Sequence, residues 1–278
     1  MKHAFLSVTY KRYPLEKAFA AAREFGYDGV EIYGGRPHAY AFDYDEQLRA
    51  DILGLIDKYE VEVPMVTPEL LFYPYNLGST DPKTAEETLT YLKKTIDMAA
   101  GIGCPRIQTA FGHGGFGIRR KTLIDHCAEM IKRLSDHCQA RGVTIILEDV
   151  TVMESNTVVF LDDLLEIMEK ADSPWVKAML DISTPVIHWE TFTDSFEMLG
   201  DRLDYIHFID CDGQGYHHYP VGEGKLPLEA LAKVILAHGY DGWLSTEIVS
   251  PYYADPDLYI GRELGRVKAL FEQKDNLL

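Results

Sequence analysis

The stretch "IILEDVTVMESN" (145–156) places three carboxylates directly after a run of β-forming residues. Apolar runs of this kind are typical of buried parallel strands, and such strands rarely end in clustered acids without a functional reason. Carboxylates hold hard divalent cations and transfer protons. Glu148, Asp149 and Glu154 are therefore the first candidates for chemistry.

Comparable residues stand at the ends of three later apolar runs. The run 176–181 ends at Asp181, the run 203–210 contains His207, and the run 242–248 contains Glu247. On neighbouring strands of one barrel, these side chains and Glu148 would meet at one mouth. Any one of them alone is more often structural, but four in register favour a shared metal. Three oxygen ligands and one imidazole suit Mn²⁺, Mg²⁺ or Co²⁺, with Zn²⁺ as a further option.

The elements that must position these residues alternate along the chain. The expected strands are 4–9, 28–33, 61–67, 106–110, 143–148, 176–181, 203–210 and 242–248. Helical patterns at 15–26, 84–103, 123–142 and 226–239 follow a 3.6-residue period and end at glycine. In 278 residues, this alternation predicts a (β/α)₈ TIM barrel, one domain over 1–278, rather than an open doubly wound sheet.

Composition limits the partners. With 27 Lys and Arg against 44 Asp and Glu, the formal charge of −17 repels nucleic acid and anionic membranes. The four cysteines show no C-x-x-C spacing and are expected to be reduced thiols in a cytoplasmic protein. The sequence shows no signal peptide and no apolar run near the ~18 residues of a membrane span. We therefore expect no nucleic-acid or membrane partner.

The chain also resembles a known family, the xylose-isomerase-like barrels that include the ketose 3-epimerases. Within this family, the chain resembles the subgroup of fructoselysine 3-epimerases. The resemblance covers nearly the whole chain. It is clearest in "GYDGVEIYGGRPHAYA" (26–41), "TPELLFYPYN" (67–76), "IILEDVTVMESN" (145–156), "MLDI" (179–182), "IHFIDCDG" (206–213), "HYPVGEGKLPL" (218–228) and "YDGWLSTEIV" (240–249).

This resemblance implies a sugar 3-epimerase with one divalent metal, Mn²⁺ foremost, held by Glu148, Asp181, His207 and Glu247. The metal would chelate the C2 carbonyl and C3 hydroxyl oxygens of a ketose or an Amadori-type ketosamine. One of the two glutamates would remove the C3 proton to leave an enediolate, and the other would return a proton to the opposite face. We also expect a homo-oligomer, either a dimer or a tetramer.

Substrate contacts follow less directly from the sequence. Glu154, six residues after Glu148, is expected to accept hydrogen bonds from substrate hydroxyls. Four further loop residues are candidates for substrate binding, and each is explained equally well as an ordinary loop residue: His113, His188, His218 and Glu223. Asp149 receives no role, because the similar enzymes tend to have proline at that position.

Other functions remain open. A ketopentose-phosphate epimerase or isomerase, or a polyol or keto-acid dehydratase, would share the fold and the metal ligands. Gly112, Gly114 and Gly117 match the dinucleotide-binding pattern G-x-G-x-x-G. However, they lie in the fourth βα unit, and the acid expected about 20 residues later is missing. Both facts disfavour an NAD-dependent dehydrogenase. An abasic-site endonuclease of this fold needs more histidines, and Thr184 stands where one is expected. A non-catalytic sugar-binding module would not need two acid–base glutamates.

Overall fold

The protein is a closed parallel barrel in the computed structural model, which describes residues 1–215, 217–249 and 251–272. The strands are β1 Lys2–Leu6, β2 Gly29–Gly34, β3 Val66–Pro68, β4 Arg106–Thr109, β5 Thr144–Leu147, β6 Val176–Asp181, β7 Leu203–His207 and β8 Trp243–Thr246. Each strand pairs with the next in sequence, and β1 closes the barrel on β8. The predicted (β/α)₈ barrel is confirmed.

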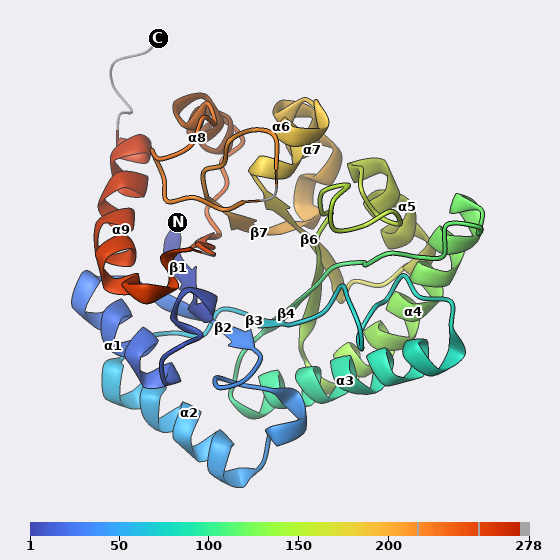
Figure 1. Ribbon diagram of the computed structural model, residues 1–278, viewed down its shortest axis with the longest axis horizontal. Coiled ribbons are helices and arrows are strands. Elements are labelled where there is room, and N and C mark those ends of the chain that lie inside the picture. Colours follow the sequence, from blue (N-terminus) through green and yellow to red (C-terminus); the bar gives the residue numbers. More distant parts are fainter. Residues whose placement is uncertain (216, 250, 273–278) are drawn as a thin grey trace.

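Helices surround the strands as an outer ring (Figure 1). They are α1 Leu15–Phe25, α2 Glu46–Tyr59, α3 Pro82–Gly101, α4 Arg120–Arg141, α5 Leu161–Ala171, α6 Ser183–His188, α7 Phe192–Leu199, α8 Leu228–Ala237 and α9 Pro256–Glu272. The part of the chain that the structure describes contains no helix with the length and apolar character needed to cross a membrane.

Local signals fix where several helices begin and end. Asp45 caps α2 by accepting a hydrogen bond from the backbone N–H of Leu48 at 2.8 Å, and Asp81 caps α3 in the same way. Gly26 ends α1 with a φ of 83°, a left-handed conformation that costs glycine little because it has no Cβ. Asp45 and Asp81 thus mark where α2 and α3 begin, and Gly26 marks where α1 ends before β2.

The core contains three apolar clusters, one of which includes Ile206 of β7 and Ile235 of α8. A large apolar layer packs the strands against the helices, with Phe5, Phe19 and Ile96 among its fully buried residues. A smaller separate cluster includes Met65 and Tyr205. Side chains alternate in direction along a strand, so we infer that this cluster fills the barrel interior below the strand ends.

Strand register decides which side chains meet at the carboxyl end of the barrel. Asp181 of β6 lies directly opposite His207 of β7, and His207 lies opposite Ser245 of β8. Glu148 follows β5 directly, and its N–H donates to the carbonyl of Thr109 on β4 at 3.0 Å. Four neighbouring strands therefore end at one level.

Some predicted strand limits were wrong. The third strand begins only at Val66, because Pro64 lacks the N–H that a strand ladder needs, and Glu62 forms a single isolated bridge with Gly29. The first strand ends at Leu6 and turns into a 3₁₀ helix, Ser7–Tyr10.

β7 ends at His207 rather than at residue 210. Asp210 lies beyond it, and its carboxylate accepts hydrogen bonds from backbone N–H groups of the following loop, including those of Gly222 and Leu226 at 3.0 Å. This buried acid organises the loop instead of continuing the strand.

Candidate active site

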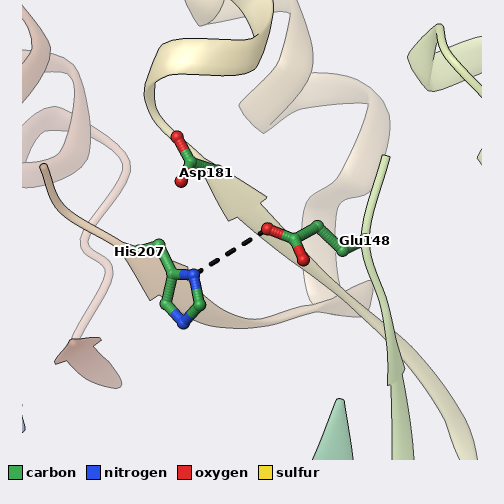
Figure 2. Close-up of side chains that lie close together, drawn as sticks. All are labelled: Glu148, Asp181 and His207. Carbon is green, nitrogen blue, oxygen red and sulfur yellow. Dashed lines mark ion pairs between the residues drawn. The ribbon is translucent and has the colours of Figure 1, made fainter. Parts of the chain in front are cut away.

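Glu148, Asp181 and His207 converge at the carboxyl end of the barrel (Figure 2). Each offers one ligand atom, and these atoms all lie within 4.8 Å of one another. His207 Nδ1 lies 3.8 Å from Glu148 Oε1, and all three residues are buried. The strand ends thus bring together three of the four residues that were predicted to bind metal.

Glu247, which follows β8, and His218 also belong to this cluster. Glu247 Oε2 lies 3.1 Å from His207 Nδ1 and 3.2 Å from His218 Nδ1, while His218 Nε2 lies 3.8 Å from Asp181 Oδ2. Asp181, His218 and Glu247 make a second group of potential ligands. His218, predicted only as a substrate contact, therefore lies among the ligand candidates themselves.

Three buried atoms in this cluster fit a bound cation. Asp181 Oδ2, His207 Nδ1 and His218 Nδ1 have no hydrogen-bond partner among the described residues, although Glu247 lies close to both nitrogens. A buried polar atom without a partner costs about 1–3 kcal/mol, so three such atoms in one cluster favour a ligand there. Oxygen atoms and one imidazole nitrogen are donors suited to a hard or borderline divalent ion.

Glu31, which the sequence interpretation missed, orients His207. Both Glu31 carboxylate oxygens lie 3.2 Å from His207 Nε2, and they also accept hydrogen bonds from Thr67 Oγ1 and from the Tyr205 hydroxyl. A carboxylate on Nε2–H fixes the tautomer and turns the lone pair of Nδ1 toward the cluster. The available signal was a glutamate within the buried strand "GVEIYG".

Neighbouring polar groups hold the carboxylates as well. Asp181 Oδ1 accepts hydrogen bonds from Ser183 N at 2.7 Å and from Ser183 Oγ at 2.6 Å, which leaves Oδ2 for the cluster. Gln108 Nε2 donates to Glu148 Oε2 at 2.5 Å, and Gln108 is itself buried on β4. The orientation of each acid is therefore set from outside the cluster.

The two glutamates have opposite electrostatic environments. Burial raises the pKa of Glu148 well above its usual range, and the charges of Glu247 and Asp181 add to the effect of burial. Burial also acts to raise the pKa of Glu247, but the adjacent His218 and His207 outweigh it and lower that pKa. For His218, burial is outweighed by Glu247 and Asp181, which raise its pKa to about 10. Carboxyl groups with pKa values shifted apart suit paired acid and base roles.

The cluster opens into a cavity of about 140 Å³. One water molecule needs roughly 10–15 Å³ on this kind of measure, so a small molecule fits. Glu154 and His218 line the cavity beside Glu148, Asp181 and Glu247. Glu154 Oε2 accepts hydrogen bonds from Thr151 N at 3.2 Å and from Thr151 Oγ1 at 2.7 Å, which fixes its carboxylate at the wall.

Three other residues predicted to contact substrate do not line this cavity. His188 Nε2 accepts a hydrogen bond from the N–H of Val152 at 3.3 Å. The Glu223 carboxylate pairs with Arg262 and Arg266 of α9 instead. The Glu223 carboxylate is therefore occupied by the protein's own groups, whereas His188 keeps a buried Nδ1 without a hydrogen-bond partner among the described residues.

His113 is the third, and it lies in the glycine-rich loop after β4. A Cβ on Gly112 would lie 1.9 Å from the carbonyl oxygen of Leu71, and one on Gly114 would lie 2.5 Å from Leu123 Cδ2. The glycines thus allow close packing against neighbouring chain, and the barrel is not the doubly wound sheet that a dinucleotide fingerprint requires. The ring of His113 packs 6.1 Å from that of Phe116.

Comparison with known proteins agrees with this geometry. The family model described as "Xylose isomerase-like TIM barrel" matches residues 19–270. The chain belongs to this family. It is 35% identical over 275 residues to fructoselysine 3-epimerase of Shigella flexneri, covering 99% of this chain and 100% of that protein.

Two solved structures share the fold at low sequence identity. D-Psicose 3-epimerase with D-tagatose, from Clostridium cellulolyticum H10, gives a TM-score of 0.81 at 15% identity and covers 98% of this chain and 99% of that one. The IOLI protein with a binding zinc atom gives 0.84 at 19% identity, with full coverage of both chains. The prediction of an isomerase related to carbohydrate 3-epimerases is confirmed by these relatives.

Proposed function

We propose that the protein is a metal-dependent 3-epimerase of a ketose or ketosamine of the fructoselysine type. The observation that carries this proposal is that Glu148, Asp181 and Glu247 line one cavity and that His207 lies directly beside them. The relatives named fructoselysine 3-epimerase, 35% and 34% identical to this chain, support the substrate class.

Glu148, Asp181, His207 and Glu247 would hold one divalent cation, for which Mn²⁺ is our first choice and Co²⁺ our second. Such an ion supplies Lewis-acid polarisation of the C2 carbonyl, which acidifies the neighbouring C3–H. The chain contributes the orientation of its ligands. Glu31 turns His207 Nδ1 inward, and the hydrogen bonds to Asp181 Oδ1 leave its other oxygen unpartnered.

Proton transfer falls to the two glutamates. Glu148 follows β5 and Glu247 follows β8, so their carboxylates approach the cavity from different parts of the barrel rim. One removes the C3 proton to leave a planar enediolate, and the other returns a proton to the opposite face, which inverts C3. Glu154 and His218 line the same cavity and would hold substrate hydroxyls by hydrogen bonds.

The charge of the cavity wall favours an unphosphorylated substrate. Lysine and arginine, the usual partners of phosphate groups, are absent from the described residues that line the cavity. Arg36 and Arg120 pair with the carboxylates of Asp43 and Asp163. The ketopentose-phosphate alternative is therefore less favoured than a free or amine-linked ketose.

The test is proton NMR in D₂O with Mn²⁺-loaded protein and three classes of substrate: fructoselysine, free ketohexoses and ketopentose 5-phosphates. We expect deuterium at C3 and appearance of the C3 epimer for fructoselysine or a free ketohexose. Absence of C3 exchange from every candidate, with metal content confirmed by elemental analysis, would contradict the proposal. Release of water with an unsaturated product would identify a dehydratase.

A cytoplasmic location and a homo-oligomeric state also belong to this proposal. The four cysteines are unpaired and buried, which suits a reducing compartment. Light scattering on a sizing column would distinguish a dimer or tetramer from a monomer of 31.5 kDa.

A further inference from the structure

The reaction cavity continues into a groove between the loops that follow β2 and β3. Tyr33, Glu69 and Leu70 line both the cavity and the groove. The outer part of the groove is lined mainly by aromatic side chains and one arginine: Arg36, Tyr40, Phe72, Tyr73 and Tyr75. A sugar held over the strand ends could therefore extend a substituent past Glu69 into this groove.

Glu69 is an exposed carboxylate without a cationic partner among the described residues. Its Oε2 accepts a hydrogen bond from the Tyr33 hydroxyl at 2.6 Å, which holds it at the junction. Arg36 does not neutralise it, because its guanidinium pairs with Asp43 at 2.6 Å and stacks on the Tyr40 ring at 4.4 Å. The junction thus keeps an uncompensated negative charge.

Exposed aromatic rings line the same groove as this carboxylate. Tyr73 is 93% exposed and Phe72 is 58% exposed, and both line the groove. Large exposed apolar side chains clustered at one place mark a binding surface more often than isolated ones do. A carboxylate next to aromatic faces is suited to an ammonium group, which binds by ion pairing and by cation–π attraction.

The rest of the cavity has the same charge preference. Its described lining includes Glu69, Glu148, Glu154, Asp181 and Glu247, with His218 as the only residue that can carry a positive charge. Carboxyl groups thus outnumber basic side chains in this lining. A positively charged substituent would therefore enter a favourable field.

We propose that Glu69, oriented by Tyr33 and set in a groove that Tyr73 also lines, forms a subsite for an ammonium group on the substituent that extends from the reacting end of the sugar. This inference rests on the proposed epimerase function and names residues that would select ketosamines over plain ketoses. Tyr33 acts as a positioning residue, because its hydroxyl contacts Glu69.

The test uses two matched probes, 1-deoxy-1-(butylamino)-D-fructose and its neutral ether 1-O-butyl-D-fructose. Dissociation constants are measured by NMR titration of the Mn²⁺-loaded protein, and kcat/KM is measured by C3 exchange. We expect the wild type to prefer the amine about fivefold or more, the worth of one partly exposed ion pair with a cation–π contact. The preference should shrink as salt is raised.

Glu69→Gln should reduce this preference to about one, and Tyr33→Phe should reduce it partly. Glu229→Gln removes an exposed carboxylate on α8, away from the cavity and the groove, and should keep the wild-type preference. An equal preference in wild type and Glu69→Gln would overturn the subsite. If neither probe is turned over, the epimerase proposal fails on these substrates, while the two dissociation constants still decide the subsite.

Discussion

Replacement of Glu31 by glutamine should weaken metal binding without touching a ligand. Glu31 is fully buried and accepts hydrogen bonds from Tyr205 and Thr67 while it faces His207 Nε2. Glutamine keeps the shape but loses the negative charge and one acceptor oxygen, so His207 becomes a poorer and less well oriented ligand. Changes of this kind typically cost 10- to 100-fold in metal affinity, or about 1.4–2.8 kcal/mol.

The assay is competition for Mn²⁺ against a fluorescent chelator, with thermal unfolding recorded on the same samples. Glu263→Gln is the matched control. Glu263 lies on α9 and is also fully buried, but its carboxyl group accepts a hydrogen bond from the backbone N–H of Val221 instead of facing His207. The control variant should keep wild-type metal affinity. Wild-type affinity in a folded Glu31→Gln variant would refute the orienting role of Glu31.

Three further outcomes are expected. Chelator treatment should abolish activity, and Mn²⁺ or Co²⁺ should restore it. Full activity in metal-free protein would contradict a metal-dependent mechanism. Asp181→Ala and His207→Ala should lose metal, whereas Glu154→Ala should keep it and mainly raise KM; metal loss in the last variant would place Glu154 among the ligands. Burial raises the pKa of Glu263 from 4.5 to about 8, so the folded protein holds a proton there that the unfolded chain releases. Stability should therefore fall between pH 5 and 8 and fall less in Glu263→Gln, as measured by urea unfolding.

Much of the fold was predictable because each strand and helix has its own local pattern. The apolar run before Asp181 and the glycine after α1 indicate their elements without knowledge of any partner. The short β3 was predicted poorly, since Pro64 interrupts an apolar run that otherwise reads as one strand. Strand length there depends on backbone pairing with β2, which composition does not reveal.

That Glu148 and His207 come together was predictable, because both stand at strand ends. Glu31 was missed because its role depends on a contact across the barrel with a residue 176 positions away. Glu223 and His188 were candidates for substrate contact from their positions in the sequence, and in the structure their side chains contact other parts of the chain. Loop direction is set by tertiary contacts, so proximity in sequence to a ligand was a poor guide there.

The most direct test of the account is C3 proton exchange in Glu148→Gln and Glu247→Gln, followed separately from each of the two substrate epimers. Each variant keeps a neutral oxygen but loses the proton acceptor on one face of the sugar. Metal affinity should fall only partly, turnover should fall by about 10²–10⁴, and each variant should lose exchange from one epimer before the other. Small, equal losses in both variants, with exchange intact from both epimers, would contradict the two-glutamate mechanism.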